Sequence, residues 1–225
     1  IAQGASLLGV SLTLADSANT FEGFESMMSQ VQAISGATGE AFDQLTEKAK
    51  QMGATTKFTA TESAEAFNYM AMAGWKTDDM LSGIEGIMSL AAASGEELGT
   101  TSDIVTDAIT AFGLKASDST HFADVLAQAS ANANTNVGML GESFKYIAPV
   151  AGALKYSVED TSLALGLMAN ASVKGSMSGT ALKTALANMA SPTDSMAIAM
   201  EKYNISLLDS SGNMKTLKGV MDNLR

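Results

Sequence analysis

The sequence predicts an all-α fold: a compact array of short helices and helical hairpins, with one small β-hairpin near the C-terminus. The first observation is composition, because only 6% of the 225 residues are aromatic, whereas Met occurs 15 times. Strands favour aromatic and β-branched residues, and helices favour Ala, Leu and Met. The second observation is the distribution of helix-breaking residues: Pro149 and Pro192 are the only prolines, but 20 glycines divide the chain. We therefore expect many helices of modest length with Gly- and Ser-marked ends.

Three helices are predicted in the first third of the chain. Residues 5–33 carry Phe and Met at spacings of three and four, which is the period of one helix face. Thr38 is expected to cap a second helix, which stops at Gly53. Thr59 with Glu62 three residues later is a capping-box pattern, so it predicts the start of the third helix.

A unit of two helices then repeats. The hydroxyl residues Thr77, Ser117 and Ser157 are spaced 40 residues apart, and each is expected to cap a helix because it can accept an otherwise unpaired backbone N–H. The apolar stripes expected on these helices are Leu81, Ile84, Met88 and Ala91; Phe122, Val125 and Ala129; and Leu163, Leu167 and Ala171. A second helix follows in each unit, at residues 99–112, 136–153 and 176–191. One hairpin cannot bury its apolar face alone, so the repeat predicts stacked hairpins.

The residue pattern after Pro192 is no longer helical throughout. Residues 205–208 and 214–215 are short runs around a Gly/Asn/Asp turn, and this pattern predicts the β-hairpin. Thr216 is expected to cap the final helix. Glycines, hydroxyl caps and Pro149 interrupt the helical pattern throughout, which predicts a compact domain rather than one continuous rod.

Charge and residue counts exclude several classes of function. Acidic residues outnumber basic ones 24 to 13, which gives a net charge of −11 and a pI near 4.4. A specific nucleic-acid groove or a polybasic membrane patch needs clustered Lys and Arg, so neither is expected. Cysteine is absent, which excludes disulfides, Cys-ligated zinc and thiol catalysis.

The single histidine, His121, is the residue through which a Ser-His-Asp triad would have to work. It lies three residues after Asp118 and beside Phe122, so one hypothesis is a general base. The favoured interpretation is a polar residue in the first turn of a helix, because the chain contains no G-x-S-x-G nucleophile motif.

Two segments resemble ligand-binding loops only weakly. Asp209 to Asn213 has some calcium-loop character but lacks the alternating acids and the terminal Glu, so a turn is expected instead. Gly175 to Thr180 is glycine-rich like a phosphate loop but lacks the G-K-[ST] lysine. The spacing of Gly175 and Gly179 is better explained by a close helix contact or a loop.

Acidic pairs and the single tryptophan complete the candidates. Glu96-Glu97 and Asp78-Asp79 could act as acid and base, but adjacent helical residues point in different directions, so solvated charge at a helix start is expected. Trp75 could be a ligand platform, and the favoured interpretation is a lid over the end of a helix pair. We predict no catalytic, cofactor-binding or metal-binding residue and no cofactor.

The N-terminal stretch from Ile1 to Ala15 carries no charge. A signal-peptide core and the end of a longer apolar segment are alternatives to an Ala/Leu helix that leads into the domain, which is the favoured interpretation. Residues 1–35 are therefore predicted to be a leading helical segment at the end of a longer upstream region, and residues 36–225 the main helical domain.

A further pattern runs through the segments 28–39, 52–58, 66–75, 106–114, 132–137 and 146–151 and the turn at 209–214. On these segments the chain resembles, from about Phe21 to Arg225, the core domain of phage tail tape measure proteins of the TP901 type. The resemblance covers about nine-tenths of the chain in order.

The resemblance implies a structural role in which the whole protein sets tail length during assembly and leaves the tail at DNA ejection. The implied partners are tail tube and tail-tip proteins, tail assembly chaperones, other copies of the chain and, at ejection, the host membrane. The implied location is the virion, in the tail lumen or at the tail tip, and the host cytoplasm during assembly. Two alternatives stay open: a membrane-active module, supported by the uncharged stretch at 1–15, and a peptidoglycan-cleaving domain that uses paired carboxylates.

Overall fold

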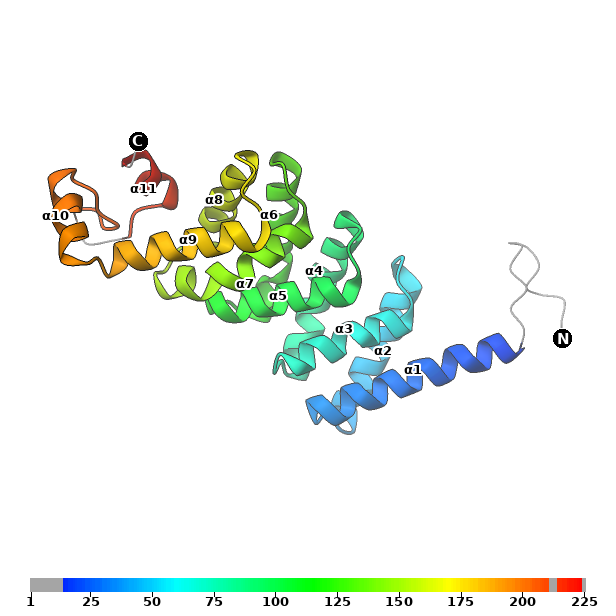
Figure 1. Cartoon of the computed structure of the whole chain (residues 1–225). Coiled ribbons are helices and arrows are strands. Elements are labelled where there is room, and N and C mark those ends of the chain that lie inside the picture. Colours follow the sequence, from blue (N-terminus) through cyan, green and yellow to red (C-terminus); the bar gives the residue numbers. More distant parts are fainter. Residues whose placement is uncertain (1–13, 211–213, 224–225) are drawn as a thin grey trace. The chain divides into compact units, whose positions relative to one another are not determined.

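The computed structural model describes residues 14–210 and 214–223, and the regular elements within them are helices apart from one isolated β-bridge (Figure 1). The predicted all-α class is therefore confirmed. The predicted helix start at residue 5 lies outside the described residues. The chain divides into two compact units between Leu81 and Ser82.

The first unit contains α1 (Leu14–Ser35), α2 (Glu40–Thr55) and α3 (Ala60–Met72), with α3 packed on both α1 and α2. The predicted capping box starts α3. Thr59 Oγ1 accepts a hydrogen bond from the Glu62 N–H at 3.1 Å, and Glu62 Oε2 accepts one from the Thr59 N–H at 2.7 Å. The buried apolar side chains of the three helices include Phe24, Met28, Val31, Leu45, Ala49, Met52, Phe67 and Met70.

Two predicted helix ends in the first unit were wrong. Thr38 does not cap α2, because the residue before the helix is Gly39, which has φ 56° and makes no side-chain cap bond. Gly53 does not end α2, which continues for two more residues. Gly53 lies instead against the backbone of Ala60, where a Cβ would have no room, so this glycine permits the close approach of α2 and α3.

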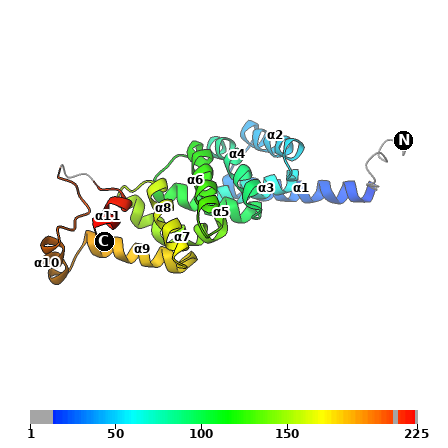
Figure 2. The same ribbon diagram turned by 90° about the horizontal axis from the view of Figure 1, so that it is seen from above.

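The second unit is built from the helical hairpins that the repeat predicts. Its elements are the remainder of α4 (Thr77–Ser94), α5 (Leu98–Phe112), the short 3-10 helix η2 (Ala116–Asp118), α6 (Ser119–Asn132), α7 (Val137–Ala153), α8 (Val158–Asn170), α9 (Gly175–Ala190), α10 (Asp194–Lys202) and α11 (Leu217–Asn223). The bounds of α5, α7 and α9 match the predicted second helices to within one residue. Helix α7 packs between α5 and α9 in one row, and α6 packs on α8 in another (Figures 1 and 2).

Phe144 of α7 lies at the centre of this unit's core. Its ring meets Phe112 at 5.8 Å between centroids and Phe122 at 5.6 Å, both edge to face. Such aromatic pairs contribute about 0.5–1.5 kcal/mol beyond the burial of their area. Because Phe112 belongs to α5 and Phe122 to α6, the three rings join the two rows of helices.

The hydroxyl-cap prediction holds in the third unit of the repeat but not in the first. Ser157 caps α8, since its side chain accepts a hydrogen bond from the Asp160 N–H at 3.1 Å. Thr77 is the first residue of α4 rather than its cap. There, the Asp79 carboxylate accepts the Lys76 N–H at 3.3 Å.

Ser117 is also not a cap, because it lies inside η2. The Lys115 N–H donates to the Asp118 carboxylate at 2.9 Å, which repeats the arrangement at the start of α4. In two of the three repeats, the backbone N–H of a lysine thus donates to the carboxylate of an aspartate three residues further along the chain. Pro149, expected to interrupt the helical pattern, lies within α7, and the helix continues to Ala153.

The apolar stripe predicted for α8 does not face the core. Leu163 and Leu167 are 47% and 43% exposed, and Ala171 is exposed as well. The buried apolar positions of α8 are instead Val158, Ala164, Leu165 and Ala169. Small and apolar residues occur on nearly all sides of this helix, so their spacing did not identify the buried side.

The predicted C-terminal β-hairpin was wrong. Among the described residues, one isolated antiparallel bridge joins Leu208 to Met214, and the Lys215 N–H donates to the Leu207 carbonyl at 2.7 Å. A single bridge supplies too few cross-strand pairs to form a hairpin. The predicted cap at Thr216 is confirmed, since its Oγ1 accepts a hydrogen bond from the Gly219 N–H at 3.1 Å.

Candidate functional site

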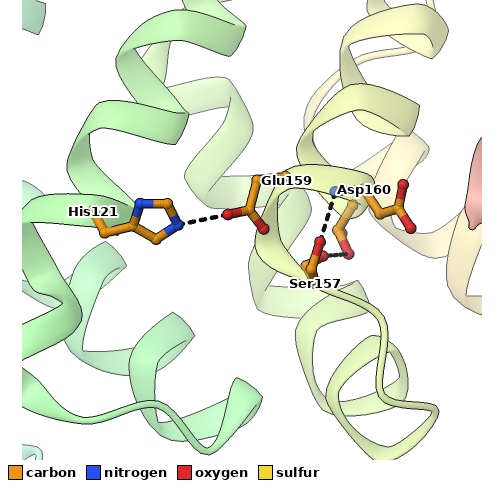
Figure 3. A network of polar contacts seen from close by, with 5 residues as sticks. His121, Ser157, Glu159 and Asp160 are labelled. Atoms are coloured by element: carbon orange, nitrogen blue, oxygen red, sulfur yellow. Dashed lines mark hydrogen bonds and ion pairs between the residues drawn. The ribbon is translucent and has the colours of Figure 1, made fainter.

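His121 lies in the first turn of α6, next to the first turn of α8. Because one antiparallel helix separates α6 from α8 along the chain, the two helices run in the same direction and their N-terminal ends lie together. His121 Nε2 is 2.5 Å from Glu159 Oε1, and Figure 3 shows the imidazole and the carboxylate pointing toward each other. The pair joins residues 38 positions apart, close to the spacing of the repeat.

Hydrogen bonds favour the ionised form of Glu159. Partial burial by itself raises the pKa of the Glu159 carboxyl. Its own backbone N–H, the Ser157 hydroxyl and the His121 ring outweigh that effect, so the pKa of Glu159 is lower than its usual value. The helix start thus favours a carboxylate at this position.

A carboxylate beside a histidine can orient a general base. Here, however, the two side chains are 61% and 51% exposed, so water screens their interaction. Exposed ion pairs stabilise a fold by about 0–1 kcal/mol. The arrangement at His121 and Glu159 therefore corresponds to a surface contact between neighbouring repeats.

The segment from Gly175 to Thr180 forms the start of α9 and packs against α7. Ser143 Oγ lies 2.9 Å from the Gly175 carbonyl oxygen and 2.8 Å from Ser178 Oγ. Gly179 lies against the backbone of Ser143. Gly179 thus makes a close helix contact, as one of the two predicted interpretations expects, whereas Gly175 begins α9 with φ 58° and nothing lies within 4 Å of its Cβ position.

The predicted acidic pairs occupy helix starts. Glu96 Oε1 accepts a hydrogen bond from the Gly138 N–H at 3.2 Å, so this side chain joins the loop before α5 to the first turn of α7. Glu97 directly precedes α5. Asp78 and Asp79 lie in the first turn of α4.

Trp75 follows the end of α3 and is buried, with 7% of its surface exposed. It offers no open platform for a ligand. Residues 211–213 of the weak calcium-loop candidate lie outside the described residues. In the described part of the chain, no three His, Asp or Glu residues group in a way that could hold a metal ion.

One charged cluster was not predicted from the sequence. Lys145 Nζ of α7 lies 3.4 Å from Asp103 Oδ2 of α5 and 3.5 Å from Glu142 Oε1. Burial lowers the pKa of Lys145, but its bonds to Asp103 and Glu142 outweigh this and raise it. Burial and the nearby Asp103 raise the pKa of Asp107. The spacing of Asp103 and Asp107 on one helix face was visible in the sequence, whereas the approach of Lys145 depends on the packing of α5 on α7.

A groove of about 400 Å³ runs between α6 and α8, directly beside the His121–Glu159 pair. Its apolar lining comes from Val125 and Ala129 of α6 and from Leu163 of α8. Polar side chains surround these residues. They are His121, Asp124, Gln128, Asn132, Glu159 and Ser162. Three residues of the stripes that the sequence predicted to face the core, Val125, Ala129 and Leu163, thus line a surface groove, whereas Phe122 of the α6 stripe is fully buried.

Comparison with known proteins gives the family. The model of the phage-related minor tail protein family matches residues 46–225. The chain belongs to this family. Two of its relatives are the tape measure protein of Pneumococcus phage Dp-1, 38% identical over 87% of the chain, and the probable tape measure protein of Escherichia phage P2, 24% identical over 90%. These names describe structural tail proteins rather than known enzymes.

This minor tail protein chain spans 17% of the Dp-1 relative and 25% of the P2 relative. No solved structure matches it. None of the helices in the described part of the chain combines the length and apolar character needed to cross a bilayer.

Proposed function

We propose that this chain is a domain of a tape measure protein, the structural protein that sets tail length during tail assembly and leaves the tail at DNA ejection. The observation that carries the proposal is the similarity to two tape measure proteins over about nine-tenths of the chain. Since the chain corresponds to a sixth to a quarter of those proteins, the length-setting role belongs to the whole protein. The domain is a structural module within it.

Within the tape measure protein, this domain is a folded end piece and not part of the extended ruler. Its hairpins depend on one another for burial, as Phe112, Phe122 and Phe144 illustrate. A single continuous helix would leave these rings without partners. Residues 36–225 form the core of the end piece and residues 1–35 the end of an upstream region, with the TP901 type as the expected subfamily.

The domain acts by binding and not by catalysis. Its single histidine is engaged by a half-exposed carboxylate, and Glu96 contacts the backbone of Gly138. The expected partners are tail tube and tail-tip proteins, tail assembly chaperones and other copies of the chain, with the host membrane a further partner at ejection. The expected locations are the tail lumen or tip in the virion and the host cytoplasm during assembly.

An interrupted gene tests the tape measure role. In the phage or prophage that encodes the protein, a stop codon within this domain should abolish tails of defined length, and a plasmid copy should restore them. Tails of normal length without the protein, seen by negative-stain electron microscopy, would exclude the proposal.

A duplicated hairpin tests the end-piece role. A second copy of residues 117–156 adds 40 residues. It should leave tail length unchanged, whereas in an extended helix those residues would add about 60 Å at ~1.5 Å per residue. A control insertion of equal length and continuous helical pattern in the flanking region should lengthen the tails. Tails that grow with the duplicated hairpin would place this domain in the ruler.

A further inference from the structure

Helices α6 and α8 present an apolar surface that the second unit does not cover. Val125 and Ala129 lie four residues apart on α6, a spacing that places them on one helix face, and with Leu163 of α8 they form the apolar lining of the groove. Leu167 lies one turn after Leu163 on the same side of α8, outside the groove lining. Nearly half of each leucine is open to solvent. A half-exposed leucine in the groove lining, with a second one turn away, marks a site where another apolar surface can be buried.

The two helices that form the groove carry acidic side chains and no Lys or Arg. Asp124 and Glu159 lie in the groove lining, where Glu159 also contacts His121. Asp160 follows Glu159 at the start of α8. Carboxylates that flank an apolar groove attract a partner of opposite charge and disfavour an acidic one.

The shape and chemistry fit one mode of recognition. A helix that lies in a groove inserts apolar residues spaced by three and four and keeps its polar sides at the groove edges. The groove volume of about 400 Å³ is large enough to receive several such side chains. A second copy of this chain would bring another net charge of −11 toward the same acidic edges, which opposes association.

We propose that the α6–α8 groove is a docking site for an amphipathic helix of another protein, with an apolar stripe that packs on Val125, Ala129 and Leu163 and with Lys or Arg residues that face Asp124 and Glu159. The inference rests on the proposed function only in expecting the natural partner among tail assembly proteins. The site itself follows from the groove and its charge.

A model peptide tests the proposal directly. The probe is a fluorescein-labelled Leu/Lys peptide of about 18 residues, long enough for a helix, with Leu at helical spacing. Fluorescence anisotropy with the intact chain should show saturable binding, and a matched Leu/Glu peptide should not bind. Failure of the Leu/Lys peptide to bind would overturn the proposal and leave the tape measure role, tested by tail assembly, unaffected.

Matched variants separate docking from general attraction to an acidic protein. D124K/E159K should weaken binding about tenfold or more. D194K/E201K makes the same change in net charge on exposed α10 and should have a much smaller effect. Likewise L163Q should weaken binding, whereas I198Q, at a side chain 68% exposed on α10, should not. Equal losses for the groove and α10 variants would overturn the proposal.

Cross-linking keeps the test valid if a groove variant fails to fold. A photoreactive benzophenone placed in the Leu stripe of the peptide should label residues 121–132 and 159–167 of the unmodified chain. Labelling confined to other segments would contradict the docking site. Sedimentation would reveal a second copy as the occupant, through a dimer that L163Q dissociates, and that result would also overturn the proposal.

Discussion

Gly179 of α9 lies directly against Ser143 of α7, so closely that a Cβ on Gly179 would overlap the Ser143 carbonyl oxygen. The contact allows the two helix backbones to approach without side chains between them. On the neighbouring side of α7, Gly152 lies in the same way against the Ala111 carbonyl. Glycines thus set the distances within the row α5, α7 and α9.

Substitution at this contact should therefore reverse the usual effect of replacing a helical glycine. Gly179→Ala should destabilise the second unit by about 1–3 kcal/mol, because the added methyl group must separate the helices. Gly23→Ala is the control, since nothing lies within 4 Å of its Cβ position in α1. It should be neutral or stabilise by up to about 1 kcal/mol. Urea unfolding of each variant would measure both, and equal effects would contradict the close contact.

The hydroxyl groups at the same interface provide a second prediction. Ser143 Oγ has the Met139 and Gly175 carbonyls and Ser178 Oγ within 2.9 Å, whereas the buried Ser162 hydroxyl has no hydrogen-bond partner in the described structure. Ser143→Ala should cost about 1 kcal/mol or more, and Ser162→Ala should be nearly neutral or stabilising. Thermal unfolding of both variants decides this. A larger loss at Ser162 would show that its hydroxyl is bonded in solution.

The helix starts yield a third pair of variants. Ser157→Ala removes the hydroxyl that accepts the Asp160 N–H and should destabilise the chain by about 0.5–2 kcal/mol. Ser117→Ala should change stability by no more than about 0.5 kcal/mol, because Ser117 is exposed within η2. Denaturant midpoints measure the difference. Equal losses of stability in the two variants would indicate that Ser117 caps a helix in solution, as the sequence predicted.

The repeat shows how far the sequence determines this fold. Helix positions in the second unit were predictable, because Gly113 and other breakers stand between strongly periodic segments. The capping group was not predictable, since Ser117 and Asp118 can both bond a nearby N–H and only the backbone conformation selects between them. Gly53 appeared to be a helix stop, yet its role depends on Ala60 of the next helix, which a local pattern does not reveal.

The candidate site was less predictable than the fold. His121 was identified as a polar residue of a first helical turn, but its partner Glu159 comes from the next repeat. The 40-residue spacing implies that equivalent helix starts lie side by side, and this signal could have indicated the pair. The exposed position of Leu163 could not be foreseen, because α8 has small or apolar residues on nearly all sides and packing alone selects the buried one.

The contact between His121 and Glu159 provides a prediction about pH. The lowered pKa of Glu159 means that its ionised form is favoured by folding, so the stabilisation is present above its ordinary pKa of 4.5 and is lost as pH falls through the lowered value. Because the side chains are half exposed, the effect on the free energy of unfolding should stay below about 1 kcal/mol. Glu159→Gln should therefore be slightly less stable than the unmodified chain at neutral pH and equally stable once Glu159 is protonated.

Direct titration gives the stricter measurement. Carbon-detected NMR of the Glu159 carboxyl should show a midpoint below 4.5 in the unmodified chain. His121→Ala should raise that midpoint, because it removes one of the hydrogen bonds and the positive charge that stabilise the carboxylate. Ser157→Ala should raise it as well, through loss of the serine hydroxyl bond. A midpoint that His121→Ala leaves unchanged would show that the first turns of α6 and α8 do not meet in solution as they do in Figure 3.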